Sequence, residues 1–262
     1  MSFVITEIKD SIGVITLDHG EKRNALSSSL VEEILCGLCA LEKKKARAVI
    51  LRARPGVNVW SAGHNVKELP EKGKDPLSET DPLRRLIAKI KQSEFPIIAM
   101  VEGGVFGGAN EVVAACDIVI AADNATFKFT PARMGVPYDR VGLLTMINAV
   151  GLRAAKEMIF TARAFGATWA EAHGLVSRVV PLSGLEKETL FEAEDIAKNA
   201  PLAIRSMKYT LGALSETALP FTVFGREDFL TETYRFKAYS SNDYEEGKRA
   251  FFEKRAPVFR GE

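Results

Sequence analysis

The sequence predicts an α/β protein, in which a core of alternating strands and helices is followed by a helical C-terminal segment. Short apolar runs typical of buried strands alternate with amphipathic helical patterns up to about residue 180. This alternation is typical of a layer of parallel strands covered by helices. From Leu185 onward the pattern is almost entirely helical. We therefore expect an α/β core over residues 1–200 and a helical segment over residues 201–262.

The individual elements follow from the spacing of apolar residues along the chain. The first helix is expected to begin at about Ser29, because Ser29 and Glu32 have the spacing of a capping box. The polar stretch 71–82 contains two prolines and predicts a loop. Continuous apolar runs predict strands, and apolar residues at every third or fourth position predict helices. The expected strands are 3–8, 13–17, 48–51, 97–101, 118–122 and 126–129, and the expected helices are 29–43, 83–92, 201–214 and 243–254.

The pair Cys36 and Cys39 could indicate redox or zinc chemistry. A redox pair lies where a helix begins, and a zinc site needs further cysteine or histidine ligands at matched spacing. Here both cysteines fall inside a helical pattern, and Cys116 is the one other cysteine of the chain. We therefore expect both to be packed helix residues. Three cysteines cannot form a disulfide framework, which favours a reducing compartment.

The composition bounds the class of protein. The 262 residues are 47% apolar and 26% charged, with a formal net charge of +1, which is ordinary for a globular enzyme. Basic clusters interleaved with aromatics are absent, as are apolar runs of the roughly 20 residues that a membrane span needs. The first ten residues do not have the pattern of a secretory signal. We expect a cytoplasmic enzyme that binds neither nucleic acid nor membrane and uses no metal and no redox cofactor.

Two turns of small residues, at 60–65 and 103–111, point to a chemical function. Each follows a strand-like run, at 48–52 and at 97–101. Small residues allow close approach of the backbone to a ligand and leave amide N–H groups available. Two such turns can direct two N–H donors at one developing negative oxygen, which is the arrangement of an oxyanion hole. Either turn alone could equally be an ordinary tight loop.

Both turns resemble motifs of the enoyl-CoA hydratase (crotonase) superfamily. Residues 62–68, AGHNVKE, resemble its A-G-x-D-[IVL]-K-E segment, and residues 103–111, GGVFGGANE, resemble its G-x-x-x-G-G-[GA]-x-E segment. Residues 22–27, KRNALS, resemble its first turn in contact with coenzyme A. The resemblance implies a crotonase-like spiral of ββα repeats, with C-terminal helices that build homotrimers, commonly paired into homohexamers. It also implies that the amides of His64 and Gly108 hold the thioester oxygen of an acyl-CoA.

One departure from the family pattern bears on the reaction. Hydratases of the family use two glutamates, and Glu111 matches the first. Pro131 occupies the place of the second, and residues 124–138 contain no carboxylate. A proline side chain neither donates nor accepts a proton. This departure argues against hydration by the two-glutamate route.

The loop motifs resemble the branch of the family that decarboxylates malonyl-type thioesters. The segments that carry this resemblance are 61–64, 68–70, 75–77, 81–84, 130–131, 135–138 and the tail 252–255. The resemblance implies a carboxy-lyase that converts methylmalonyl-CoA to propanoyl-CoA and CO2 through an enolate. The alternatives are decarboxylation of ethylmalonyl-CoA, hydration or isomerisation of an enoyl-CoA, and a non-catalytic homologue that binds coenzyme A.

The expected catalytic residues follow from this chemistry. Loss of CO2 needs no base, but it needs stabilisation of the carbonyl oxygen and a carboxylate turned out of the enolate plane. The hydroxyls of Tyr138 and Thr130 suit this orientation, because a neutral donor does not over-stabilise the ground state. Glu111 could help to protonate the enolate or could cap the helix that Gly108 begins. The role of the His64 imidazole is left open.

The resemblance also implies a set of residues in contact with coenzyme A. Phe252 and Lys254 belong to a tail segment that can close over the nucleotide of a neighbouring subunit. The complete expected set is Arg23, Ala25, Ala62, Gly63, His64, Phe252 and Lys254. His19 and His173 lie outside any motif, so we expect them to be surface or packing residues.

Overall fold

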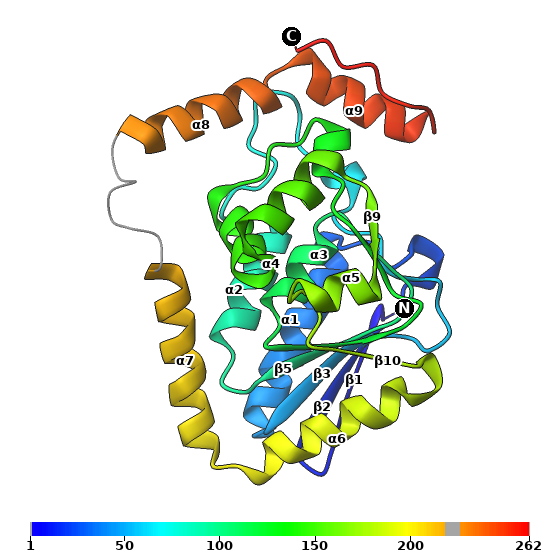
Figure 1. Ribbon diagram of the computed structural model, residues 1–262, viewed down its shortest axis with the longest axis vertical. Helices are drawn as coiled ribbons and strands as arrows, with labels where there is room; N and C mark the ends of the chain where they lie inside the picture. The colour runs from blue at the N-terminus through cyan, green and yellow to red at the C-terminus, as the bar shows by residue number, and fades with distance from the viewer. Residues whose placement is uncertain (1, 218–225, 262) are drawn as a thin grey trace.

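The computed structural model describes residues 2–217 and 226–261. Its main element is a six-stranded sheet in the order β1-β2-β3-β5-β7-β10 (Figure 1). The strand β1 pairs antiparallel with β2, and all other neighbours are parallel. The strands are β1 (Val4–Lys9), β2 (Ile12–Leu17), β3 (Ala48–Ala53), β5 (Ile97–Val101), β7 (Ile118–Ala122) and β10 (Arg178–Val180).

A second sheet of four short strands lies beside the first, in the order β4-β6-β8-β9. Its strands are β4 (Val59–Ser61), β6 (Gly104–Phe106), β8 (Thr126–Lys128) and β9 (Ala164–Gly166). The chain enters the large sheet, then the small sheet, and then a helix, three times in succession: β3-β4-α2, β5-β6-α3 and β7-β8-α4. This order is the ββα repeat that the family resemblance implied. The three-residue strands β4, β6 and β9 were not predicted from the sequence.

The helices surround the sheets and then extend away from them (Figure 1). The helices that pack against the sheets or against the other helices of the core are α1 (Ser28–Lys43), α2 (Pro82–Gln92), α3 (Ala109–Ala115), α4 (Arg140–Thr161), α5 (Ala167–Ala172) and α6 (Leu185–Lys198). The C-terminal helices are α7 (Pro201–Thr217), α8 (Arg226–Tyr239) and α9 (Asn242–Phe252). Part of the predicted helical segment, residues 218–225, lies outside the described residues.

The large sheet is buried on both faces. On β3, Val49 and Leu51 belong to the main core, which is filled by the helices α1, α2 and α3 and by the small sheet. Ile50 faces the opposite side and packs with Leu185 and Ala193 of α6. A parallel sheet covered on both faces requires continuous apolar strands, and β5 and β7 have them.

Two expectations for the first helix are wrong. The N-cap of α1 is Ser27, whose hydroxyl accepts from the amide of Leu30, while the side chain of Glu32 pairs with Arg85. Cys36 and Cys39 lie within α1 as predicted, but both are exposed and not packed. The helix buries the face that includes Ile34, Gly37 and Leu38, and the two cysteines lie on its exposed side.

Candidate active site

The two turns of small residues lie next to each other because β4 and β6 are neighbouring parallel strands. Each turn follows the end of its strand, so both emerge at the same edge of the small sheet. The turns come after β3 and β5 along the chain, and the short strands β4 and β6 lie between. The contact between the turns is very close: a Cβ atom built at Gly63 would lie 2.3 Å from the carbonyl oxygen of Phe106 and 3.0 Å from the amide nitrogen of Gly108. With φ at +80° as well, position 63 accepts only glycine.

The amides of His64 and Gly108 are brought together by this contact. A Cβ atom built at Gly108 would lie 3.8 Å from the amide nitrogen of His64. Within residues 2–217 and 226–261, neither amide donates a hydrogen bond to another protein group. The two N–H groups are therefore available to one acceptor between the turns, as an oxyanion hole requires.

The turn at His64 is also fixed to the segment that contains Arg23. The amide of Ala62 donates to the carbonyl of Arg23 over 2.8 Å, and the amide of Leu26 donates to the carbonyl of Gly63 over 2.8 Å. Arg23 has φ at +53°, and its side chain is exposed. Arg23, Ala25, Ala62 and Gly63 thus lie in two segments that backbone hydrogen bonds hold together.

Glu111 is the fully buried acid of this region, and it lies in the first turn of α3. Arg84 of α2 binds both of its carboxylate oxygens, with Nη1 at 2.8 Å from Oε1. The hydroxyl of Tyr138 donates to Oε2 over 2.6 Å. Arg84 also lies 3.3 Å from Asp139, the N-cap of α4. The Glu111 side chain therefore binds Arg84 and Tyr138 and does not cap its own helix.

Burial decides the protonation of this cluster. It raises the pKa of the Glu111 carboxyl, against the opposing effects of the Arg84 charge and of the hydrogen bonds from Arg84 and Tyr138. Burial and the charge of Glu111 raise the pKa of Tyr138 well above its ordinary value. The Tyr138 hydroxyl therefore stays protonated and acts as a donor.

The two hydroxyls proposed to orient a carboxylate both lie beside the second turn. The oxygen of Tyr138 is 3.5 Å from a Cβ position at Gly108, and Oγ1 of Thr130 is 3.2 Å from a Cβ position at Gly107. The Tyr138 ring packs edge-on against Phe129, with the centroids 4.8 Å apart. The hydroxyl of Thr130, unlike that of Tyr138, has no hydrogen-bond partner among the described residues.

Pro131 directly follows Thr130 and begins a short 3-10 helix, Pro131–Met134. Its ring is buried, and the next acid after it along the chain, Asp139, caps α4 and faces Arg84. The position at which the family resemblance predicts the second glutamate of hydratases therefore holds an apolar ring.

Sequence reasoning missed Arg84 and Asp81 as part of the site. Asp81 is the N-cap of α2, and its Oδ1 accepts from the amide of Leu83 over 2.9 Å. Its Oδ2 lies 2.9 Å from Nε2 of His64. The signal for the helix start was present, because an N-cap aspartate followed by proline begins a helix. That signal does not identify the residues that the side chains of Arg84 and Asp81 contact.

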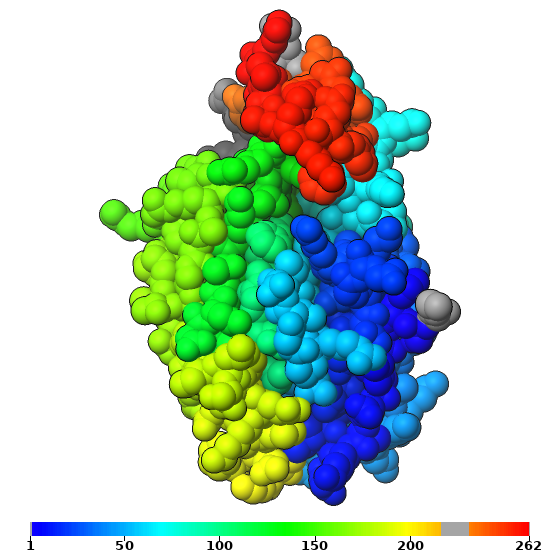
Figure 2. All heavy atoms as spheres, turned by 90° about the vertical axis from the view of Figure 1, so that its right-hand side faces the viewer, coloured from blue at the N-terminus to red at the C-terminus, as the bar shows by residue number. Residues whose placement is uncertain are grey.

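Phe252 and Lys254 lie away from the other predicted site residues. Both side chains are exposed, at the end of α9, and Figure 2 shows that helix at one end of the molecule. Among the described residues, neither side chain forms an ion pair or hydrogen bond with the segment around Arg23. A role of Phe252 and Lys254 in binding a nucleotide remains a prediction that concerns a neighbouring subunit.

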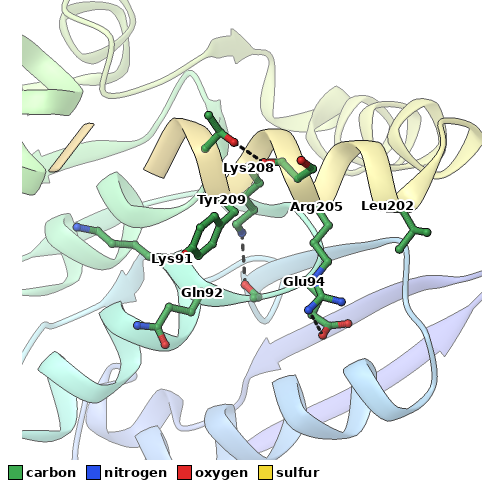
Figure 3. A pocket seen from close by; sticks show the side chains of 10 residues that line it. Lys91, Gln92, Glu94, Leu202, Arg205, Lys208 and Tyr209 are labelled. Atoms are coloured by element: carbon green, nitrogen blue, oxygen red, sulfur yellow. Dashed lines mark hydrogen bonds and ion pairs between the residues drawn. The ribbon is translucent and has the colours of Figure 1, made fainter. Parts of the chain in front are cut away.

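A pocket of about 510 Å³ between the end of α2 and α7 contains none of these site residues (Figure 3). Arg205 and Glu94 form an ion pair of 2.9 Å on its wall. Within the part of the chain that is described, no group of three or more His, Cys, Asp or Glu side chains is placed to hold a metal ion. No helix of that part combines the length and apolarity of a membrane span.

Residues 7–262 match the family model Enoyl-CoA hydratase/isomerase, and the chain belongs to this family. The predicted α/β fold with C-terminal helices is that of the crotonase superfamily and is confirmed. The chain is 42% identical to the methylmalonyl-CoA decarboxylase of Escherichia coli K12, over 96% of this chain and 95% of that protein. It is 33% identical to the hydroxycinnamoyl-CoA hydratase-lyase of Pseudomonas fluorescens, over 79% and 76% of the two chains.

Solved structures show the same relationship. A methylmalonyl-CoA decarboxylase in complex with 2-nitronate-propionyl-CoA superimposes with a TM-score of 0.95 at 40% identity, covering 99% of both chains. A methylmalonyl-CoA decarboxylase complexed with 2S-carboxypropyl CoA also gives a TM-score of 0.95 at 40% identity, covering 100% of this chain and 99% of that chain.

Proposed function

We propose that this chain is a carboxy-lyase that converts methylmalonyl-CoA to propanoyl-CoA and CO2. The observation that carries the proposal is the combination of two free amides, at His64 and Gly108, with an apolar ring, Pro131, at the place of the second acid. The first feature serves every reaction that passes through a thioester enolate, and the second disfavours addition of water. The similarity to methylmalonyl-CoA decarboxylases over nearly the whole chain supports the same reaction.

In the proposed mechanism, the thioester oxygen lies between the amides of His64 and Gly108. The C–C bond to the carboxylate breaks, its electron pair moves into the thioester carbonyl, and CO2 leaves. The resulting enolate carries its charge on the oxygen that the two N–H groups hold. Each such donor contributes about a 10²–10³-fold effect on rate. A proton taken up at the α-carbon completes the reaction.

We assign the orientation of the departing carboxylate first to the hydroxyl of Thr130. Tyr138 has a single hydroxyl proton, which it donates to Glu111, whereas the hydroxyl of Thr130 has no such partner in the described chain. Tyr138 lies close enough to the second turn to serve as the other donor once its proton turns away from Glu111. Glu111 is held by two partners on both oxygens, so we assign it to the positioning of Tyr138 and not to proton transfer.

The coenzyme A portion is proposed to bind along Arg23, Ala25, Ala62 and Gly63, and the backbone hydrogen bonds between their two segments support this proposal. Phe252 and Lys254 would contribute from a second copy of the chain in a trimer or hexamer. The chemistry requires no metal and no redox cofactor, and we propose that the enzyme uses none. We place the reaction in the cytoplasm.

One assay tests the proposal and its alternatives. Purified protein without added metal or nucleotide is given malonyl-CoA, methylmalonyl-CoA and ethylmalonyl-CoA, and CO2 release is measured beside addition of water to crotonyl-CoA. We expect methylmalonyl-CoA to give propanoyl-CoA and CO2. Hydration of crotonyl-CoA without decarboxylation would overturn the proposal, and inactivity on all four substrates would favour a non-catalytic homologue.

A further inference from the structure

The His64 side chain forms a contact that the proposed mechanism does not use. Its Nε2 lies 2.9 Å from Oδ2 of Asp81, and its Nδ1 lies 3.2 Å from the carbonyl oxygen of Asn65. The two side chains of this pair are almost buried, with 12% and 11% of their surface exposed. The pair joins the turn that carries the His64 amide to the N-terminus of α2.

The partners of the two ring nitrogens define the protonation of His64. The carbonyl of Asn65 can only accept a hydrogen bond, so Nδ1 must carry a proton. The carboxylate of Asp81 also only accepts, so Nε2 must carry one as well. A neutral imidazole has one N–H and would leave one of the two contacts without a proton. The geometry is satisfied by the imidazolium.

We propose that Asp81 is a positioning residue, which holds His64 as an imidazolium and thereby fixes the His64 amide relative to α2. This inference rests on the proposed function only where it concerns the rate of the reaction. The coupling is direct: one oxygen of Asp81 binds His64, and the other caps α2 at Leu83. The next residue of α2, Arg84, holds Glu111, which lies in the first turn of α3, the helix that follows the second turn. One carboxylate therefore ties together the two turns that supply the amides.

The charges around the imidazole agree with this assignment. Burial acts to lower the pKa of His64, but the hydrogen bond and the charge of Asp81 oppose it and raise the pKa above the ordinary value. Glu68, from the 3-10 helix Val66–Glu68, adds a smaller effect in the same direction. A raised pKa means that the pair is complete at low pH and loses one donor as the pH rises through that pKa. Turnover should therefore fall on the alkaline side.

The closing experiment begins with Asp81→Asn. Asparagine still caps the helix and can donate to Nε2 of a neutral imidazole. The substitution therefore keeps both contacts of the side chain at position 81 and removes its negative charge. The protein contains three histidines, so ¹³C-labelled histidine gives three separable titrations by NMR. We expect the pKa of His64 to be lower in Asp81→Asn than in the wild type. An unchanged pKa of His64, or a wild-type value at or below that of an ordinary imidazole, overturns the inference.

The kinetic part compares Asp81→Ala with Asp75→Ala. Asp75 makes the same kind of contact on the same loop, accepting from the amide of Leu77 over 2.9 Å and pairing with Arg235. We expect Asp81→Ala to lower kcat about ten- to a hundredfold, with KM for the thioester nearly unchanged, and Asp75→Ala to keep kcat. Asp81→Asn should keep most of kcat. Its kcat should no longer decrease as the pH rises, as that of the wild type does.

An unchanged kcat in folded Asp81→Ala overturns the positioning role. A wild-type protein that releases no CO2 refutes the proposed function instead. In that case the NMR titration still decides whether Asp81 holds the imidazolium.

Discussion

At the scale of single residues, Arg84 and Glu111 show how strongly burial changes the value of an ion pair. Arg84 is almost buried and Glu111 fully buried, so neither charge can be solvated if its partner is removed. The adjacent residue Arg85 forms the same type of pair with Glu32, but about half of each side chain is exposed. Neighbouring arginines of one helix thus offer a matched comparison.

We expect Arg84→Met to lower the free energy of unfolding by about 3–5 kcal/mol, because it leaves the Glu111 carboxylate buried without a counter-charge. Arg85→Met should change it by less than about 1 kcal/mol, since an exposed pair gains little over hydration. Urea unfolding of the two variants measures the difference. Equal effects would mean that water reaches Glu111.

The hydroxyls of Thr130 and Tyr138 can be separated by nearly isosteric substitutions. Thr130→Val removes the unpartnered hydroxyl, and we expect kcat for methylmalonyl-CoA to fall about ten- to a hundredfold. Tyr138→Phe removes a donor to Glu111 as well, so it should lower kcat similarly and also reduce stability. Binding of propanoyl-CoA, which has no carboxylate to orient, should change little in either variant. Thr126→Val, at the exposed start of β8 and four residues before Thr130, is the control.

A wild-type rate in folded Thr130→Val would assign the carboxylate to Tyr138 alone. A wild-type rate in both variants would mean that neither hydroxyl orients it.

At the scale of elements, the close contact between the two turns depends on glycine at position 63. We expect Gly63→Ala to lower kcat about 10²–10³-fold, because the new Cβ forces the turns apart and removes one donor from the oxygen. Gly56→Ala is the control: Gly56 also has a positive φ, of +83°, but nothing lies within 4 Å of its Cβ position. Equal loss of activity in the two variants would assign the effect to backbone strain and not to the contact between the turns.

The sequence predicted some elements well because their signal is local. The strands β5 and β7 are where they were expected, since a buried parallel strand is a continuous apolar run bounded by turns. The strands β4 and β6 are three residues long, which is too short for a periodic pattern. They are strands because they pair with each other. The long helix α4 was missed because its pattern breaks at Gly151, which has φ at +74°.

The candidate site was predictable in part for the same reason. The turns around His64 and Gly108 are contiguous motifs, so their residues could be named from the sequence. Arg84 and Asp81 act through contacts with residues 27 and 17 positions away. Such contacts depend on how α2 packs against the two turns, which no local pattern specifies.

At the scale of the whole molecule, α7 has few contacts with the rest of its own chain (Figure 1). Lys208 anchors it, donating to the carbonyl of Phe95 over 2.9 Å and pairing with Asp117 at 2.6 Å; Figure 3 shows Lys208 reaching from α7 into the pocket. Most other side chains of α7 are exposed, and the large apolar ones among them are Leu202, Met207, Tyr209, Leu211 and Leu214. A single helix of this length is marginal without tertiary packing.

A second copy of the chain is the occupant that we expect on this surface, because α4, which contacts α7, also exposes large apolar side chains. Leu152 and Phe160 of α4 are exposed, Phe160 by 75%, and the two helices already touch where Asn148 donates to the carbonyl of Ser215. A contiguous apolar surface of this kind marks an interface. We therefore expect a trimer or hexamer by light scattering.

The assembly can be tested by placing a charge at the centre of the apolar face of α7. Leu211→Glu should shift the protein toward smaller species, because burying the carboxylate between subunits costs more than the contact contributes. Leu182→Glu introduces the same charge at an exposed leucine outside α4 and α7, and it should leave the mass unchanged. A full-length wild type that is monomeric at micromolar concentration would contradict the prediction. If Phe252 and Lys254 bind the nucleotide of a neighbouring subunit, Leu211→Glu should also raise KM for the thioester, and the rise should be reversed at protein concentrations that restore the assembly.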